Sequence, residues 1–283
     1  MAFIPPHFLN TVVALGLPSQ DGKIQYTATG FLYGSPTGAT DESGNMRYHI
    51  FLVTNRHVFK DIFKNSDTLC ARFNKPMNTG AHVYSIQKEE SSLAVHSDVD
   101  VAVLGIDHNV LDSSGIEYSC FAGDTQAFRL EQALTKEISE GDGVFVLGFP
   151  LGQAGDERNY VIVRHGIIAR IQDCLKGDAR TFLIDSSIFP GNSGGPILLK
   201  PEISSIRGTK PNSQCVLIGM ISSYLPYQEV AVSEQTGRRR MVFEENSGLG
   251  VVVPIDLIQE TVDILVRKLE LGESADSDTQ GAD

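Results

Sequence analysis

The chain has 283 residues, which is enough for one large hydrophobic core or for two units of ordinary size. Hydrophobic residues make up 41% of the sequence, so a globular protein is expected and an intrinsically disordered one is excluded. The formal net charge is -12, which argues against nucleic acid or an anionic membrane surface as a partner.

The cysteines and the N-terminus favour a reducing compartment. The cysteines are scattered and form neither a CxxC pair nor a metal-binding cluster, so we expect reduced thiols and no metal or cofactor, although the sequence leaves one or two disulfides open. Residues 1–7 contain no basic signal region, and no apolar run approaches the roughly 20 residues that span a bilayer. We therefore expect a cytoplasmic protein without a membrane partner. The cysteines are Cys70, Cys120, Cys174 and Cys215.

Residues 1–120 predict a unit built from short strands. Apolar and β-branched runs are separated by turn sequences and alternate weakly, as expected when one face of each strand lines a core. Ser35 to Asn45 is rich in turn residues, and Asn55 to Phe63 predicts a short helical turn after a strand. The predicted strands are 11–16, 26–33, 48–54, 68–74, 81–87 and 101–106.

A connector and a second β unit follow. Residues 121–140 form the connector, with mild helical spacing from Thr125 to Ile138, and the second unit spans 141–254. Many short strands with little helix predict an all-β protein of barrels or sandwiches. The predicted strands of the second unit are 144–150, 160–171, 181–187, 196–199, 215–222 and 248–254.

The period of the apolar residues changes near the end of the chain. From Ile255 these residues fall at helical spacing, with Asp256 near the start as a cap, so we predict a C-terminal α-helix over 255–271. Residues 272–283 are acidic and are expected to form a disordered tail.

The most specific motif is the glycine-rich segment from Gly191 to Pro196, in which Ser193 stands among glycines. Glycine permits the tight turns and positive φ angles with which backbone amides reach a ligand. A serine hydroxyl is a weak nucleophile that needs a base, and the base needs an orienting acid. A phosphate-binding loop is the alternative, but no lysine follows and the next residues are strand-like.

The chain supplies both missing groups upstream of the serine. His57 follows an apolar strand and is the candidate general base, and Asp100 begins another apolar run and is the candidate orienting acid. Asp98 falls on the same strand face as Asp100 and is the alternative acid. The amides of Gly191 and Ser193 are the candidate donors to a developing oxyanion.

Taken together, these segments resemble a trypsin-like serine protease of the chymotrypsin fold, closest to the bacterial Deg/HtrA protease domain. The resemblance rests on Thr54–Val58 around the histidine, Asp100–Leu104 around the aspartate and Gly191–Pro196 around the serine, and it covers residues 11–254. It implies two six-stranded antiparallel β-barrels, with the triad of His57, Asp100 and Ser193 in the cleft between them.

The resemblance also implies where a substrate binds. Ser187 and Ile188 would line the primary specificity pocket, and Ser222, Ser223 and Tyr224 would pair with the substrate backbone as an added strand. No acidic residue falls at the base of that pocket. We therefore expect a small or medium apolar residue at P1, the position before the scissile bond, rather than arginine or lysine.

The sequence departs from secreted trypsins at two positions. Asn192 replaces the aspartate that anchors a freed N-terminus in those enzymes, so activation by that route is not expected. Val58 replaces the cysteine that follows the histidine, which suits a disulfide-poor cytosolic relative. Because the chain ends soon after the protease unit, we expect no PDZ domain.

Leu225 to Asn246 is a long polar insertion that carries the arginine cluster Arg238–Arg240. A solvated hairpin is one interpretation, and a regulatory or substrate-contacting loop is another. The arginine cluster adds a third, a self-cleavage or partner site. The sequence leaves all three open.

We expect a serine endopeptidase that acts on protein or peptide substrates through a covalent acyl-enzyme. A second hypothesis is the same enzyme held latent until an activating or targeting protein, or a ligand, orders its loops. The alternative from another class is a catalytically silent trypsin fold that binds or senses a partner. The presence of all three triad residue types argues against a silent fold.

Overall fold

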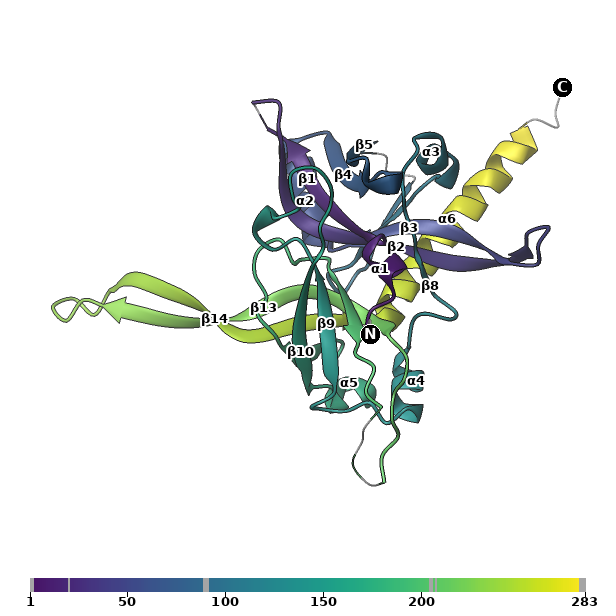
Figure 1. Cartoon of the computed structure of the whole chain (residues 1–283). Coiled ribbons are helices and arrows are strands. Elements are labelled where there is room, and N and C mark those ends of the chain that lie inside the picture. Colours follow the sequence, from purple (N-terminus) through teal and green to yellow (C-terminus); the bar gives the residue numbers. More distant parts are fainter. Residues whose placement is uncertain (1–2, 20, 89–91, 204–205, 207, 280–283) are drawn as a thin grey trace.

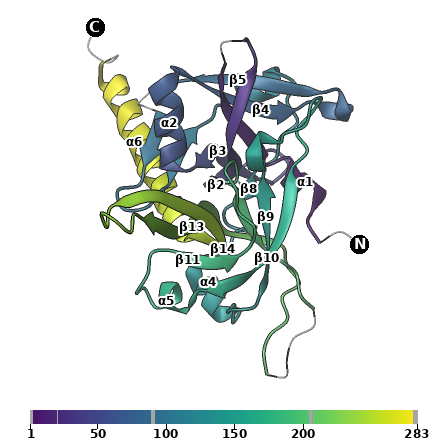
Figure 2. The ribbon, with the colours of Figure 1, turned by 90° about the vertical axis from the view of Figure 1, so that its left-hand side faces the viewer.

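A computed structural model describes residues 3–19, 21–88, 92–203, 206 and 208–279. Two β units are stacked, with the N-terminal unit above the C-terminal one in Figure 1, and Figure 2 shows the same stacking from the side. The C-terminal helix α6 (Ile255–Thr279) follows the second unit directly and packs against strands of the first. Both units therefore contribute to the surroundings of this helix.

The N-terminal unit is a sheet of eight strands in the order β5-β4-β1-β2-β3-β7-β6, with β8 paired to β2. Its pairings are antiparallel except for that of β2 with β8. Phe31 on β2 lies opposite Val12 on β1 and Val53 on β3, so apolar residues of the three central strands are aligned side by side. The strands are β1 (Val12–Pro18), β2 (Ile24–Thr40), β3 (Met46–Thr54), β4 (Thr68–Asn74), β5 (Ala81–Gln87), β6 (Leu93–Val95), β7 (Ala102–Gly105) and β8 (Phe121–Ala122).

The C-terminal unit is a closed barrel with the strand order β10-β11-β14-β13-β12-β9. Strands β13 and β14 are much longer than the other four, and their outer halves leave the barrel as a two-stranded ribbon. The strands are β9 (Gly143–Gly148), β10 (Ile162–Arg170), β11 (Phe182–Asp185), β12 (Pro196–Leu199), β13 (Val216–Val232) and β14 (Arg239–Pro254).

Short helices connect the strands. Helix α2 (Arg56–Asn65) follows β3 and buries Val58, Phe59 and Ile62 in the N-terminal core, as its amphipathic spacing predicts. The other helices are α1 (Pro6–Leu9), α3 (His108–Ser113), α4 (Leu130–Thr135) and α5 (Gln172–Leu175), with 3-10 turns at Pro76–Asn78 and Pro150–Gly152.

One hydrophobic cluster crosses the boundary between the two units. It joins Phe31 and Val53 of the N-terminal sheet to Leu147 and Val253 of the barrel, and to Ile258 of α6. Each unit also has a cluster of its own. Because burial of apolar area is the main favourable term in folding, the shared cluster fixes how the two units face one another.

The predicted all-β fold with two units and a C-terminal helix is confirmed. The strands predicted at 68–74, 81–87 and 196–199 have the predicted bounds. The N-terminal unit differs from the six-stranded barrel that the resemblance implies. Over the described residues it has eight strands, and they form an open sheet rather than a closed barrel. Strands β6 and β8 are too short to show a period in the sequence, and β8 lies in the predicted connector.

Two segments are more regular than the sequence predicts. Strand β2 continues to Thr40, through part of the predicted turn, because Ser35, Pro36 and Thr40 pair with β3. Helix α6 continues to Thr279, beyond its predicted end and into the predicted tail. A single glycine at position 272 costs a helix only about 1 kcal/mol, and no proline follows to stop it. Residues 280–283 of the predicted tail lie outside the described residues.

The four cysteines are free thiols in the structure. Burial raises the pKa of the Cys174 thiol to about 11, which keeps it protonated and unreactive at neutral pH. Within the described ranges, the helices lack the combination of length and apolar content that a bilayer crossing requires.

Candidate active site

His57 stands in the first turn of α2, directly after a buried strand. β3 ends at Thr54 and α2 begins at Arg56. Two contacts join the histidine to Asp100: its backbone amide donates to Oδ1 at 3.0 Å, and Nδ1 lies 2.6 Å from Oδ2. The buried side chain of Asn55 donates to the Asp100 carbonyl at 2.8 Å and holds the two segments together. Asp100 therefore orients the imidazole and leaves Nε2 for proton transfer.

The charges of this pair stabilise each other. The hydrogen bond to Asp100 raises the pKa of His57 above its ordinary 6.5, against an opposing effect of burial. Burial by itself would raise the pKa of Asp100, but the hydrogen bonds and charge of His57 hold it below its ordinary 3.8. At neutral pH Asp100 is therefore a carboxylate, which favours the Nδ1–H tautomer of His57.

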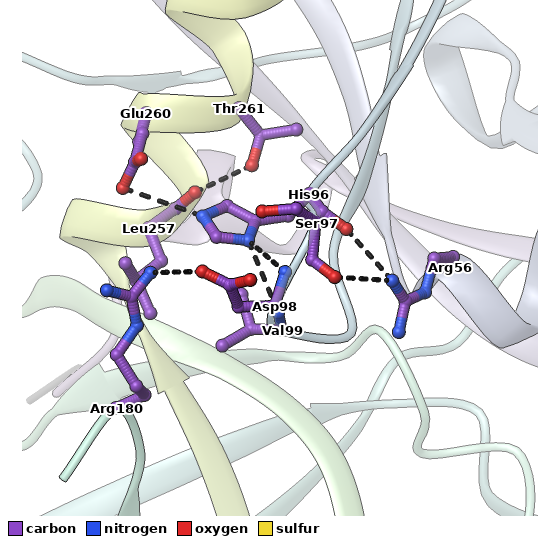
Figure 3. A network of polar contacts seen from close by, with 9 residues as sticks. All are labelled: Arg56, His96, Ser97, Asp98, Val99, Arg180, Leu257, Glu260 and Thr261. Atoms are coloured by element: carbon purple, nitrogen blue, oxygen red, sulfur yellow. Dashed lines mark hydrogen bonds and ion pairs between the residues drawn. The ribbon is translucent and has the colours of Figure 1, made fainter.

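The segment that precedes Asp100 is held from two sides, as Figure 3 shows. On one side Arg56 Nη1 donates to the carbonyls of His96 at 2.9 Å and Ser97 at 3.2 Å. On the other side the Glu260 carboxylate of α6 lies 3.5 Å from His96 Nε2. Helices α2 and α6 together therefore position the loop that carries the acid.

His96 is the buried centre of that segment, with a side chain only 2% exposed. Its Nδ1 accepts hydrogen bonds from the amides of Asp98 at 3.0 Å and Val99 at 3.2 Å (Figure 3). Because Nδ1 accepts, the ring proton lies on Nε2 and faces Glu260. The imidazole thus satisfies two loop amides that would otherwise be buried without a partner.

Asp98, the alternative orienting acid, points away from the histidine. Its exposed carboxylate lies 3.5 Å from Arg180 Nη2, whereas the carboxylate of Asp100 contacts His57 (Figure 3 shows the Asp98 pair). The expectation of a shared face assumed an extended strand, but residues 97–100 form a bend. The structure therefore pairs His57 with Asp100 and not with Asp98.

Ser193 lies on a turn that depends on its glycines. Gly191 and Gly194 have φ angles of 97° and 83°, in the region that favours glycine. A Cβ atom on Gly194 would lie 2.0 Å from the carbonyl oxygen of Thr29 and 2.2 Å from Thr54 Oγ1. Only glycine lets the serine turn approach β2 and β3 this closely.

Thr29 on β2 binds the serine turn to the N-terminal unit. Its amide donates to the Ser193 carbonyl at 2.9 Å, and its hydroxyl donates to the Gly191 carbonyl at 2.6 Å. The same hydroxyl accepts from the Phe149 amide at 3.0 Å, and the Thr54 hydroxyl donates to the Thr29 carbonyl at 2.7 Å. The serine turn and the histidine are therefore anchored on the same pair of strands.

The two candidate oxyanion donors are available. The Pro190 carbonyl accepts from the Leu151 amide at 2.6 Å, and since N–H and C=O point in opposite directions across a trans peptide, the Gly191 amide points away from Leu151. Among the described residues, neither the Gly191 amide nor the Ser193 amide donates a hydrogen bond. Such a pair of free amides on a glycine turn can stabilise a developing negative charge.

Asn192 braces the turn from within. Its side chain is fully buried, and Oδ1 accepts from the Phe189 amide at 3.2 Å. Its own amide donates back to the Phe189 carbonyl at 3.0 Å. The two bonds close the turn locally around the position where secreted trypsins have an aspartate.

The predicted substrate strand contributes to the catalytic pair as well. The register of β13 shifts at Ser222, and this residue's hydroxyl donates to Asp100 Oδ2 at 3.4 Å. Such a bulge turns a side chain toward a site that a regular strand would not reach. Ser223 is exposed, and Tyr224 is half-buried with its hydroxyl on Glu244 at 3.0 Å.

The two predicted pocket residues differ in exposure. Ser187 is exposed, whereas Ile188 is 2% exposed and packs closely against Gly250, where a Cβ would lie 2.9 Å from Ile188 Cγ1. The Asn246 side chain donates to the Ile188 carbonyl. The Ile188 side chain thus belongs to the apolar core of the barrel, and Ser187 remains accessible to solvent.

The structure brings two of the three predicted catalytic residues into direct contact and links the third to them only through other residues. His57 contacts Asp100 directly, and Ser193 is connected to that pair through Thr29 and Thr54. A second connection runs through β13, because the amide after Ser193 donates to the carbonyl before Ser222 at 3.0 Å. The Ser193 side chain is half-buried, and its hydroxyl makes no hydrogen bond within the part of the chain that the structure describes.

The sequence model of the trypsin-like peptidase domain matches residues 28–201, which is more than half of the chain. The chain belongs to the trypsin-like peptidase family. The matched range includes His57, Asp100 and Ser193.

Two solved structures are similar to this peptidase. One is Rv3671c from M. tuberculosis H37Rv, a serine-to-alanine mutant in its inactive form. Its sequence is 14% identical, the match covers 92% of this chain and 88% of that chain, and the TM-score is 0.45. The other is the Rv3671c protease in its inactive form, with 14% identity, coverage of 91% and 90%, and a TM-score of 0.45. No curated protein matches the chain.

Several residues that shape the peptidase site have no sequence signal of their own. Thr29 and Thr54 are β-branched residues within strands, where threonine is common, so nothing marks their hydroxyls as contacts. His96 is an isolated histidine beside a short strand. These residues are recognised only when the segments that they bridge are placed side by side.

We predict that Gly194→Ala lowers peptide hydrolysis by about 100-fold or more, because displacing the serine turn by about 1 Å is enough for a loss of that size. The Cβ atom would lie 2.0 Å from the Thr29 carbonyl oxygen. Because that oxygen belongs to the backbone, no side-chain rotation can relieve the clash. Steady-state hydrolysis and thermal unfolding measure the two consequences.

Gly177→Ala is the matched control. Gly177 has a φ angle of 81°, but a Cβ there meets no atom within 4 Å. This variant should lose only the roughly 1–2 kcal/mol of stability that a positive φ costs, with hydrolysis unchanged. Equal activity of the two variants would contradict the role assigned to the Gly194 contact.

Proposed function

We propose that this peptidase is a serine endopeptidase that cleaves protein or peptide substrates through a covalent acyl-enzyme. The observation that carries the proposal is the 2.6 Å contact between Asp100 and His57, beside a serine turn with two free amides. A nucleophile, a base, an orienting acid and anion-binding amides are the parts that acyl transfer requires.

In the proposed reaction, His57 takes the proton of the Ser193 hydroxyl while the serine oxygen bonds to the substrate carbonyl carbon. The carbonyl oxygen becomes an oxyanion and accepts from the amides of Gly191 and Ser193. The imidazolium, held by Asp100, protonates the leaving amine as the C–N bond breaks. Water, deprotonated by His57, then attacks the acyl-serine and releases the acid.

We infer that the oxyanion turn already has its working conformation in the free protein. Support comes from the Leu151 and Thr29 contacts that orient the peptide groups on either side of Gly191. An enzyme that stays latent until an activating or targeting protein binds is the competing hypothesis. A silent binding module is the second competitor, and the contact between His57 and Asp100 argues against it.

A Deg/HtrA-like protease of the cytoplasm is our proposal for the subfamily and the compartment. The four free thiols and Val58, at the position where the secreted enzymes have a cysteine, support a reducing environment. Recovery of the protein in the cytoplasmic fraction of its own cells tests the location, and recovery in an oxidising compartment would contradict it.

We predict that a fluorophosphonate probe labels the wild-type protein at one site and that Ser193→Ala abolishes labelling. Removing a triad serine lowers kcat by about 10⁶-fold, so peptide hydrolysis should disappear as well. Ser43→Ala, an exposed serine in the turn between β2 and β3, is the control and should keep full labelling. Absence of labelling under every condition would support the silent module, and labelling only with a partner present would support latency.

We predict that kcat/KM rises with pH through a midpoint above 6.5, because the general base must be neutral and Asp100 raises the pKa of His57. In Asp100→Asn the midpoint should move to lower pH and the plateau should fall by about 10⁴-fold. A pH–rate profile on one peptide measures both quantities. If the midpoint of the pH–rate profile were unchanged in Asp100→Asn, Asp100 would not be the group that raises the pKa of His57.

We propose a small or medium apolar P1 preference, since the exposed predicted pocket residue, Ser187, is uncharged and the resemblance places no acid at the base of the pocket. We predict that a peptide library varied at P1 is cleaved best at such residues. A Ser187→Asp replacement, at the exposed one of the two predicted pocket residues, should shift the preference toward basic P1 residues. Dominant cleavage after arginine or lysine by the wild type would contradict the proposal.

A further inference from the structure

The outer halves of β13 and β14 form a two-stranded arm, defined here as residues 226–246, that leaves the barrel and projects away from the body (Figures 1 and 2). Every residue of the arm except Ser233 is exposed. The exposed residues include Met241 at 57%, Val242 at 50% and Phe243 at 52%. Met241 and Phe243 share one face of the ribbon and Val242 lies on the other, and exposed apolar side chains of this kind indicate an interaction surface.

The outer edge of β14 is free along the arm. Within the described residues, β13 pairs with one side of residues 239–246, and β11 joins the other side of β14 only at 249–252. A free edge presents backbone amides and carbonyls that can pair with another strand. Because a two-stranded ribbon is marginally stable alone, an added strand would also stabilise the arm.

The sequence of this edge is polarised along its length. It begins with Arg239 and Arg240, continues with the apolar residues 241–243, and ends with Glu244 and Glu245. Over the residues that the structure describes, neither end has an ion-pair partner of opposite charge. Glu244 accepts hydrogen bonds only from neutral side chains. Such a strand is complementary to a copy of itself that runs in the opposite direction.

We propose that a second copy of this chain occupies the edge, with its β14 antiparallel to the first across a twofold axis at Val242. A twofold axis normal to the sheet pairs each residue with one on the same face, so odd-numbered residues face odd-numbered ones. Opposite charges and apolar pairs at facing positions both stabilise a sheet. The facing pairs are Val242 with Val242, Met241 with Phe243, Arg240 with Glu244, and Arg239 with Glu245.

Neighbouring registers lack this complementarity. An axis at Phe243 would place Val242 opposite Glu244 and Met241 opposite Glu245. An axis at Met241 would place Arg240 opposite Val242. Only the axis at Val242 pairs both arginines with glutamates and keeps the apolar residues together. The irregularity of β14 at Arg240 falls on the outer charge pairs and leaves the pairs formed by residues 241–243 regular.

The expected dimer is weak and sensitive to salt. One strand from each copy makes a small interface, so association should depend on protein concentration in an accessible range. The charge pairs are exposed, so ionic strength should weaken them. The dimer does not depend on the proposed peptidase activity, and we would measure it in a Ser193→Ala background to prevent self-cleavage.

Sedimentation velocity across a range of concentrations tests the proposal with a charge swap. One variant carries Arg239→Glu and Arg240→Glu, and the other carries Glu244→Arg and Glu245→Arg. Each alone places like charges opposite each other and should raise the dimer dissociation constant about tenfold or more. An equal mixture restores every charge pair and should dimerise, as should the variant with all four changes.

A cysteine pair locates the axis independently. Val242→Cys should form an intermolecular disulfide under mild oxidation, because this residue faces itself across the proposed axis. Val230→Cys is the matched control, since Val230 faces Val242 within one arm but belongs to the other strand. It should not crosslink.

The proposal is overturned if the protein is monomeric at all concentrations, or if a dimer persists in both charge variants alone. It is also overturned if Val230→Cys crosslinks as well as Val242→Cys. Uptake of a peptide substrate along the edge by a protein that stays monomeric would assign the edge to substrate instead.

Discussion

The close approach of Gly194 to the Thr29 carbonyl sets the position of the serine turn in this protein. The space there is too small for any Cβ, so the serine turn reaches β2 only through a glycine. Thr29 then fixes the carbonyls of Gly191 and Ser193, and Thr54 fixes Thr29. Because β3 leads directly into the histidine, one pair of strands determines the placement of both Ser193 and His57.

The acid is positioned by a different set of elements. Its carboxylate is surrounded by the His57 amide, the imidazole and the Ser222 hydroxyl, which together satisfy a half-buried charge that would be costly alone. The loop before it is held between α2 and α6 through Arg56 and His96 (Figure 3). The C-terminal helix therefore supports the site, although it follows the last barrel strand and contributes no triad residue.

The arm differs from the body of the protein in which residues it exposes. The body of the protein buries its apolar residues in three clusters, whereas the arm exposes apolar residues and unpaired charges along a free edge. The candidate site lies where the two units meet, whereas the proposed association uses a ribbon that extends from β13 and β14. The polar insertion in the sequence is a hairpin, as one of its three interpretations proposed.

Local patterns in the sequence determined the strands at 68–74, 81–87 and 196–199, the helix after β3, the start of α6 and the residue types of the site. These follow from period, turn residues and a glycine motif, which act over a few neighbouring positions. Only the tertiary structure decided between Asp100 and Asp98, because a bend separates their directions. It also assigned the contacts of Thr29 and Ser222, since their partners lie far away in the chain and meet only when the two β units pack together.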